Sequence, residues 1–305
     1  MRGAQLMAHA SDEASWHAVI KAFDEAIARD PAFAAAHALR ATALIDLSVQ
    51  THDLASLERL RETARQSADT AVRLEPDFAV AYAARAFVRS VGFLDFGAAT
   101  AQDVERAVSL APGSAAAVKI FSSYFSFIGH RDAAIVGSQR AIELDPENYT
   151  VRSNYAIILT RARRYPEALE AIDEVKRINP ADQWQGAIGD IYNATGRPAL
   201  AVDVCAPVEV EAYGCLAIAY HALGRQAEAE EALRTQQAKN GDAGAFDYAE
   251  VYAQWGDIPQ ALKWLEIAAR KKSRSIQNLR GDWALDPLRN EARYKAIEQE
   301  FHFPP

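Results

Sequence analysis

The chain of 305 residues is poor in cysteine, proline and glycine and has no long apolar run. Two cysteines cannot build a disulfide framework, and 12 prolines and 15 glycines are too few for a low-complexity or collagen-like chain. No apolar stretch approaches the roughly 18 residues that a membrane span needs. Because 50% of the residues are hydrophobic, we expect an ordered globular chain without a membrane span.

Positive charge is also scarce. Lys and Arg total 33 against 41 Asp and Glu, so the net charge is −8. A nucleic-acid backbone is bound by clustered positive charge, and we therefore expect no nucleic-acid partner. The opening MRGAQLMAHASDEASW has no apolar core and does not resemble a secretory signal. We expect a cytoplasmic location; a periplasmic one stays open if a membrane span precedes this region in the native product.

The two cysteines, Cys205 and Cys215, form no metal-ligand spacing with each other. We expect both to be small buried apolar side chains with free thiols, in a reducing compartment.

A proline closes a similar phrase five times, at positions 31, 76, 112, 146 and 180. The phrases are AIARDP, AVRLEP, AVSLAP, AIELDP and VKRINP, and the spacings are 45, 36, 34 and 34 residues. A recurrence in this range indicates stacked supersecondary units. Within each repeat, apolar residues three and four positions apart predict two amphipathic helices.

Helix ends and small residues support this division into repeats. In the clearest repeat, 115–147, Asp132 is a good N-cap for the second helix. Pro166, Pro198 and Pro259 stand in the first turn of later second helices, where a missing N–H costs nothing. We expect Pro207 to truncate the second helix that precedes it. Small residues predicted at close helix crossings are Ala134, Ala141, Ala156, Ala168 and Val175.

This pattern is identified as the tetratricopeptide repeat, and the resemblance covers nearly the whole chain. It implies an all-α, right-handed superhelical solenoid of stacked antiparallel helix pairs, about eight repeats in a single array. The expected parts are a clipped first repeat (1–31), a repeat with an 11-residue insertion (32–78), regular repeats (79–181), degenerate or shortened repeats (182–270) and a C-terminal capping segment (271–305).

Three phrases resemble a narrower group. They are the inserted linker VQTHDLASLERL, the phrase VGFLDFGAATAQDVERAVSLAPG and the tail LRGDWALDPLRNEARYKAIEQEFHFPP. They are similar to the C-terminal repeat region of bacterial signalling proteins that carry an N-terminal winged-helix or class III nucleotide cyclase domain. The tail matches that group's ending at Asp282, Asp286, Pro287, Leu288, Arg289 and Tyr294 and departs from it at Asn290 and Glu291.

No catalytic constellation accompanies the repeats. The seven histidines form neither H-E-x-x-H nor a zinc-finger spacing, and there is no Walker A, G-x-S-x-G or dinucleotide fingerprint. Acidic pairs fall on expected solvated faces or at helix starts. We therefore expect no enzyme activity, no cofactor and no metal site.

The remaining route to function is the concave groove of the array. Its mixed polar lining, with Phe127, Ile157 and Phe246 as apolar anchors, suits a protein or peptide segment. The alternatives are a groove that is only solvated surface, or one filled by the chain's own termini. The expected groove residues are Lys119, Ser123, Ser126, Phe127, Ser153, Ile157, Thr160, Arg161, Gln183, Asp190, Asn193, Ile218, His221, Phe246 and Glu250.

Two other interpretations are weaker. Chaperone-tail-binding domains clamp a carboxylate with lysine, asparagines and further basic residues; here Ser123 and Ser126 replace the asparagines, so a dicarboxylate would be poorly paired. The one basic run, ARKKSRSIQNLR at 269–280, could meet phosphate or an acidic partner. It more simply offsets a helix dipole, unless Trp264 or Trp283 is exposed beside it.

The leading hypothesis is a non-enzymatic repeat scaffold that binds a protein or peptide in its groove. The alternative, implied by the narrower resemblance, is the regulatory or sensory C-terminal portion of a bacterial transcription regulator or nucleotide cyclase whose effector domain is absent from this sequence.

Overall fold

The described part of the chain is built of paired helices. The computed structural model describes residues 2–7, 10, 12–50, 54–180, 183–207 and 213–305, and no β-strand occurs among them. The predicted all-α fold of paired helices is confirmed. Internal contacts form two compact lobes: the N-terminal lobe, residues 1–124 with 302–305, and the C-terminal lobe, residues 125–301.

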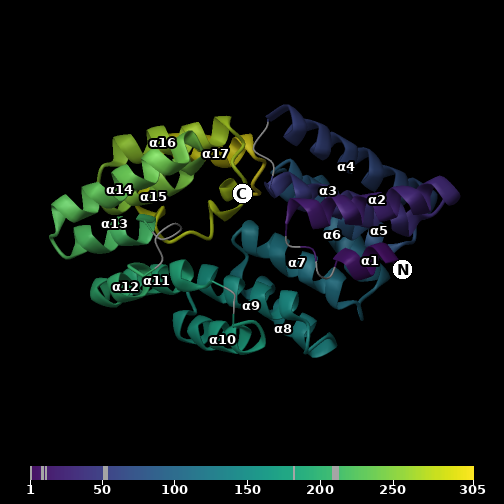
Figure 1. Cartoon of the computed structure of the whole chain (residues 1–305), viewed down its shortest axis with the longest axis horizontal. Helices are drawn as coiled ribbons and strands as arrows, with labels where there is room; N and C mark the ends of the chain where they lie inside the picture. The colour runs from purple at the N-terminus through teal and green to yellow at the C-terminus, as the bar shows by residue number, and fades with distance from the viewer. Residues whose placement is uncertain (1, 8–9, 11, 51–53, 181–182, 208–212) are drawn as a thin grey trace. The chain divides into compact units, whose positions relative to one another are not determined.

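In the N-terminal lobe, helices that follow one another in sequence pack together: α2 on α3, α3 on α4 and α5 on α6 (Figure 1). The elements are α1 (Arg2–Met7), α2 (Glu13–Arg29), α3 (Ala34–Gln50), α4 (Leu54–Leu74), α5 (Ala79–Phe87), the π-helical turn η1 (Val88–Gly92), α6 (Ala98–Leu110) and α7 (Ala115–Phe127), whose residues from Phe125 onward belong to the C-terminal lobe.

Among the described residues of the C-terminal lobe there are four regular pairs, in which α9 packs on α10, α11 on α12, α13 on α14 and α15 on α16. Nowhere in the described residues is a helix both long and apolar enough to cross a membrane. The elements are α8 (Arg131–Leu144), α9 (Tyr149–Arg161), α10 (Tyr165–Ile178), α11 (Gln185–Ala194), α12 (Pro198–Cys205), α13 (Tyr213–Ala222), α14 (Gln226–Asn240), η2 (Gly241–Gly244), α15 (Ala245–Gln254), α16 (Ile258–Arg270), η3 (Arg274–Asn278), η4 (Asp286–Leu288) and α17 (Ala292–Glu300).

Most of the predicted helix ends are confirmed. Pro166, Pro198 and Pro259 lie in the first turns of α10, α12 and α16. The short helix α12 has eight residues and ends before Pro207, as the sequence predicted. The N-cap of α8 was predicted wrongly: the helix begins at Arg131, so Asp132 lies inside its first turn, where its charge still favours the helix dipole.

Several turns between consecutive helices use the left-handed backbone region. Gly129, Gly196, Gly224 and Gly256 have φ of 84°, 70°, 73° and 80°. Between α9 and α10 this place is taken by Arg163, at φ 64°. A side chain in this region costs on the order of 1 kcal/mol, which glycine avoids. Arg163 therefore needs a compensating contact, and one is described below.

Small side chains fill the close helix crossings. Ala134, Ala141, Ala156, Ala168 and Val175 are each at most 1% exposed. At these positions two helices approach too closely for a larger side chain, as expected from the repeat pattern.

The inserted residues after α3 were predicted as a linker, and this is largely wrong. They lengthen the helices instead: α3 has 17 residues and α4 has 21, against 14 in α10. Residues 51–53 of the predicted linker lie outside the described residues. The segment LASLERL has the apolar spacing and the strong helix formers that allow α4 to begin at Leu54.

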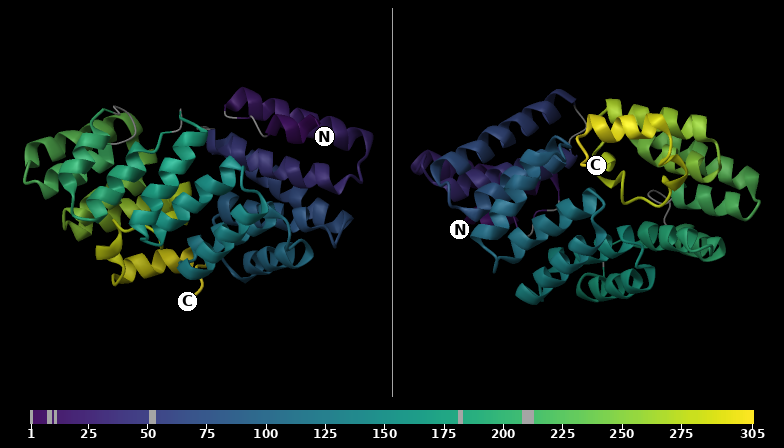
Figure 2. Two further views of the ribbon diagram at one scale, coloured as in Figure 1. Left: turned by 90° about the horizontal axis from the view of Figure 1, so that it is seen from below. Right: turned by 180° about the vertical axis from the view of Figure 1, so that it is seen from behind.

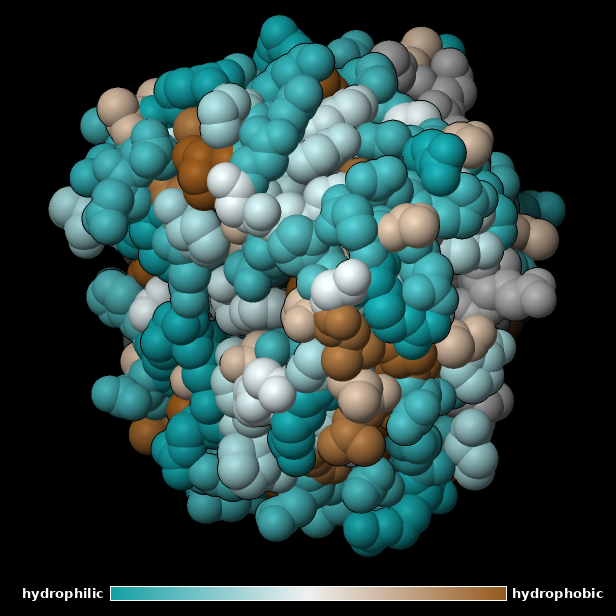
Figure 3. Space-filling model, turned by 90° about the vertical axis from the view of Figure 1, so that its left-hand side faces the viewer, coloured by the Kyte–Doolittle hydropathy of each residue, from teal (hydrophilic) through white to brown (hydrophobic). Residues whose placement is uncertain are grey.

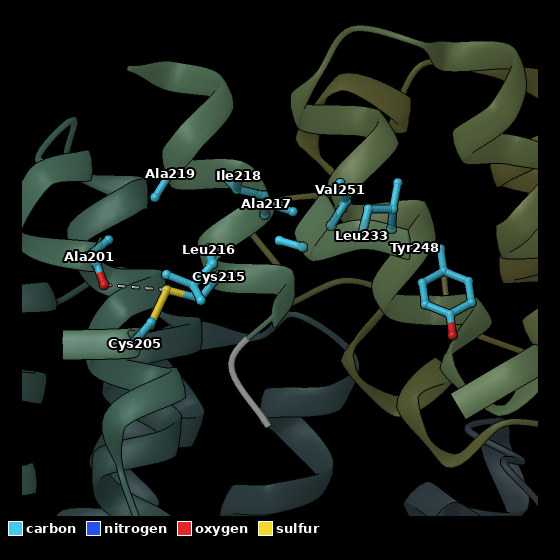
Figure 4. Packing of buried hydrophobic residues seen from close by; sticks show 11 residues of the cluster. Ala201, Cys205, Cys215, Leu216, Ala217, Ile218, Ala219, Leu233, Tyr248 and Val251 are labelled. Atoms are coloured by element: carbon cyan, nitrogen blue, oxygen red, sulfur yellow. Dashed lines mark hydrogen bonds between the residues drawn. A yellow bond between two sulfur atoms is a disulfide. The ribbon is translucent and has the colours of Figure 1, made fainter. Parts of the chain in front are cut away.

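The prediction of two free thiols is also wrong. Cys205 at the end of α12 and Cys215 in α13 form a disulfide inside a buried cluster (Figure 4). The reason lies on the neighbouring helix, where a Cβ atom at Gly189 would collide with both sulfur atoms. Glycine at this crossing leaves the space in which the two thiols meet, and Ala201 and Leu216 complete the cluster around them.

Candidate functional site

A segment of the chain lies inside the C-terminal lobe. Residues 274–291, which follow α16 and contain η3 and η4, pass between the α9 and α15 sides of the lobe (Figures 1 and 2). We call them the inner segment. Arg161 at the end of α9 donates from Nη2 to Oδ1 of Asn278 at 2.5 Å. Gly281 permits this approach, because a Cβ atom there would lie only 3.0 Å from the Arg161 side chain.

Two further contacts hold the inner segment. Arg163 donates to Oδ1 of Asp286 at 2.6 Å, and Gln254 of α15 donates to the carbonyl oxygen of Ala284 at 2.7 Å. Burial alone would raise the pKa of Asp286, but hydrogen bonds from Arg163 and Arg289 outweigh it and leave that pKa lowered. We call the sides of α9, α11, α13 and α15 that face this segment the inner face.

Two residues of the tail, Arg289 and Tyr294, donate hydrogen bonds to backbone carbonyl oxygens of the inner segment. Arg289 donates to the carbonyl oxygens of Arg280 and Asp282, at 3.1 and 2.8 Å. The Tyr294 hydroxyl donates to the carbonyl oxygen of Leu279 at 2.7 Å. Residues that the sequence singled out as a family ending therefore have a structural task within this lobe.

Beside the inner segment lies a cavity of about 260 Å³, which we call the acidic cavity. Four carboxyl groups line it: Asp190 of α11, Asp247 and Glu250 of α15, and Asp282 of the inner segment. No basic side chain of the described residues is part of its lining. All four acidic residues are half-buried.

Burial and mutual repulsion raise the pKa values of Asp190, Asp247 and Glu250. The pKa of Asp190 rises to about 8, by burial and then by the charges of Asp282 and Asp247. The pKa of Asp247 rises to about 6 for similar reasons. The pKa of Glu250 lies well above its ordinary value, through burial, the charge of Asp282 and a hydrogen bond with it. Burial also lowers the pKa of nearby Arg161, to about 10.

The rest of the cavity wall is amide and apolar. Gln236 of α14 is 5% exposed, and its Nε2 donates to Oδ2 of Asp247 at 3.2 Å. Its Oε1 has no hydrogen-bond partner among the described residues. Ile218 and Trp283 supply apolar surface. The cavity thus offers several hydrogen-bond acceptors beside a hydrophobic wall.

The structure brings some of the predicted groove residues together. Asp190, Ile218 and Glu250 line the acidic cavity, and Arg161 lies beside it against the inner segment. One alternative for the groove was that the chain's own terminus fills it. On this part of the inner face, the inner segment near the C-terminus occupies the groove in that way.

Other predicted groove residues serve the interior. Phe246 is 2% exposed and belongs to the core, so it offers no surface to a partner, and its predicted role as an anchor is contradicted by its burial. Phe127 is 7% exposed, with the Arg161 guanidinium 5.2 Å from its ring centroid. Asn193 donates from Nδ2 to the carbonyl oxygen of Cys215 at 3.0 Å, tying α11 to α13.

The remaining predicted residues are scattered. Lys119 and Ser123 lie in the N-terminal lobe, and burial lowers the pKa of Lys119. Ile157 of α9 is 36% exposed and is the one predicted apolar anchor with free surface in the described C-terminal lobe. Ser126 is buried, Ser153 and Thr160 are half-buried, Gln183 is exposed, and His221 stacks on Trp255 with centroids 5.4 Å apart.

Two cations of the basic run at 269–280 are paired with acidic residues of the same lobe. Lys271 pairs with Asp242 at 3.0 Å, and Arg280 pairs with Glu298 at 2.7 Å. Trp264 is partly buried against the core, so it does not provide an exposed aromatic side chain for a docking surface.

Sequence reasoning missed much of the acidic cavity. Asp247 and Gln236 carry no repeat signature, and Trp283 was considered only for its exposure. Asp282 was noted as part of the tail, but the α-helical period does not tell which helix face a segment without a regular α-helix meets. A usable signal was present in Asp190 and Glu250, two acids already predicted on the inner face.

Comparisons with known proteins agree with the fold. Residues 129–191 match the family described as tetratricopeptide repeat. No curated protein matches the sequence. Among solved structures, the chain is similar to the APC/C hetero-tetramer Cut9–Hcn1, with 14% identity over 94% of this chain and 52% of that one and a TM-score of 0.57. It is also similar to the human IFIT1 dimer with PPP-AAAA, with 12% identity, coverages of 85% and 69%, and a TM-score of 0.53.

The chain spans about half the length of the Cut9–Hcn1 chain that it matches. At these identities the likeness concerns the fold, and neither comparison points to a winged-helix or cyclase-linked group. The sequence pattern of the tetratricopeptide repeat is therefore present over residues 129–191, and the likeness to these solved structures concerns the fold of paired helices.

Proposed function

We propose that this chain is a non-enzymatic repeat scaffold that binds a protein or peptide segment on the inner face of its C-terminal lobe. The supporting observation is that this face already binds polypeptide. Arg161, Arg163 and Gln254, from the ends of first helices or the turn after one, hold the inner segment through side-chain and backbone acceptors.

A partner segment would use the part of α9 beyond these contacts. Ser153, Ile157 and Arg161 are spaced four residues apart and therefore share one side of α9. Arg161 is taken by the inner segment, whereas Ile157 is 36% exposed. An exposed apolar side chain flanked by polar ones suits an extended segment, or a helix that presents one apolar residue.

Much of the visible surface is unsuited to wide apolar docking. The face in Figure 3 is mostly hydrophilic, with apolar residues in small separate patches. The human IFIT1 structure includes PPP-AAAA, but a net charge of −8 does not favour a phosphate-rich partner for this chain. We therefore infer a peptide rather than a nucleic acid.

The test is a peptide-display selection against the full chain, followed by titration of the selected peptides. Ile157→Glu should weaken their binding by at least about tenfold, because it places a charge where an apolar residue would pack. The matched control is Val136→Glu on α8, at a position 66% exposed on a second helix of the same lobe. Equal losses in both variants, or selection of no peptide, would refute the proposed face.

The regulatory alternative stays a prediction drawn from the narrower resemblance. The residues that motivated it, among them Asp286 and Arg289, hold the inner segment in place. This structural task accounts for the tail motif without an effector domain, and we therefore favour the scaffold.

A further inference from the structure

Acidic side chains are concentrated at the acidic cavity, and the neighbouring Arg161 guanidinium interacts electrostatically with one of them, Asp282. Asp190, Asp247, Glu250 and Asp282 face one small space, and no basic residue lines it in the described chain. Bringing carboxylates together in a half-buried site is costly unless a cation joins them or protons bind. The raised pKa values of Asp190, Asp247 and Glu250 reflect that cost.

The side chain of Gln236 indicates that a ligand of the acidic cavity would be a hydrogen-bond donor. Its Nε2 is engaged by Asp247, while its Oε1 is buried without a partner in the described structure. Leaving a buried carbonyl oxygen unpaired destabilises the fold. A ligand with several N–H groups would satisfy this oxygen and the carboxylates at once.

The carboxyl groups do not form a metal site. No group of three or more His, Cys, Asp or Glu side chains among the described residues converges well enough to hold a metal ion. They are spread around a space of about 260 Å³ that also has apolar walls, Ile218 and Trp283. An organic cation with a hydrocarbon chain fits both properties: its charge faces the acids and its methylene groups face the apolar wall.

We propose that the acidic cavity binds a primary alkylammonium group, with Asp190 and the Gln236 Oε1 among its acceptors and Trp283 beside its alkyl chain. A compact ammonium with three N–H donors suits acceptors that come from separate helices, whereas a guanidinium favours two oxygens of one carboxylate. The four acids are half-buried, so the cavity is accessible to a ligand. This site does not depend on the peptide-binding face proposed above.

The experiment is isothermal titration of the full chain with pentylamine, and with pentan-1-ol as the uncharged control. The amine should bind with a saturable one-to-one isotherm and the alcohol should not. Asp190→Asn should weaken amine binding by at least about tenfold, since it removes a carboxyl group that can release its proton and face the ammonium as a carboxylate, and it leaves the shape unchanged. Asp203→Asn on α12, at an exposed position outside the cavity, should leave binding unchanged.

A loss of amine binding in Asp190→Asn cannot be explained by unfolding. Removing a carboxyl group that is repelled by its neighbours should stabilise the fold, while it should weaken amine binding. A second variant, Gln236→Leu, tests the unpaired oxygen without altering charge and should also weaken the amine. The proposal is overturned if no amine saturates at millimolar concentration, if the alcohol binds equally well, or if Asp190→Asn binds as tightly as the original chain.

An alkylammonium group can come from a small diamine or from the lysine of a polypeptide. Titrations with 1,5-diaminopentane and with a capped peptide containing one lysine separate these sources. Tighter binding of the diamine assigns the site to a small molecule, and tighter binding of the peptide assigns it to a partner's lysine. Either result supports the ammonium site, and neither requires Ile157.

Discussion

Asp190 shows how burial alters a single residue. Its pKa is 3.8 in the unfolded reference and about 8 in the fold, where burial and the charges of Asp282 and Asp247 favour the protonated form. Between these values the folded chain holds a proton that the unfolded chain releases. Folding is therefore favoured at low pH, and this contribution is lost as the pH rises through about 8.

Asp190→Asn should accordingly raise the melting temperature, and more so at alkaline pH. Each 1 kcal/mol corresponds to roughly 2–4 °C for a chain of this size. Melting curves of both proteins at about pH 5 and about pH 8.5 provide the test. Asp203→Asn should change neither curve. An equal pH slope in Asp190→Asn and the original chain would show that Asp190 does not titrate in this range. Glu250 and Asp247 also have raised pKa values, so part of the dependence of melting temperature on pH should remain in both proteins.

At the scale of elements, the disulfide joins the end of α12 to α13. It closes a loop with a sequence separation of 10, and cross-linking a loop of this length stabilises a fold by about 3 kcal/mol in the chain-entropy account. Because α12 is short, this cross-link replaces part of the packing that a longer second helix supplies elsewhere in the lobe.

The double substitution Cys205→Ala and Cys215→Ala should therefore lower the free energy of unfolding by about 3 kcal/mol, as measured by urea denaturation. Reduction should destabilise the original chain to a similar extent and leave the double variant unaffected. The disulfide would be disproved by titration of two free thiols in the native protein.

At the scale of the whole molecule, each lobe has its own buried clusters. Ala38, Ala71 and Ala81 belong to one in the N-terminal lobe, and Ile172 and Leu265 are core residues of the C-terminal lobe. In helical-repeat proteins, stability is set by neighbouring repeats rather than by one global core. The two lobes can consequently differ in stability.

Hydrogen exchange followed along a urea gradient should reveal two groups of peptides, one from each lobe. Reduction of the disulfide should shift the C-terminal group alone, because both cysteines belong to that lobe. A single transition that moves as a whole on reduction would contradict the independence of the lobes.

The sequence predicted the repeating elements well and the site only in part. Alanines at the crossings and Pro166 at the start of α10 follow from the helical period and from proline chemistry, which are local. The disulfide and the inner segment are not local. Gly189 lies in a different helix from both cysteines, and the position of Asp282 depends on where the inner segment, which has no regular α-helix, crosses the lobe. Periodicity carries no information on either.

The disulfide also limits how this sequence can change during evolution. A Cβ atom at position 189 would occupy the space of both sulfur atoms, so the glycine and the two cysteines fit only as a set. In descendants of this chain, a side chain larger than hydrogen at Gly189 should appear together with loss of the cysteine pair. The three positions, on three different helices, then vary as one inherited character.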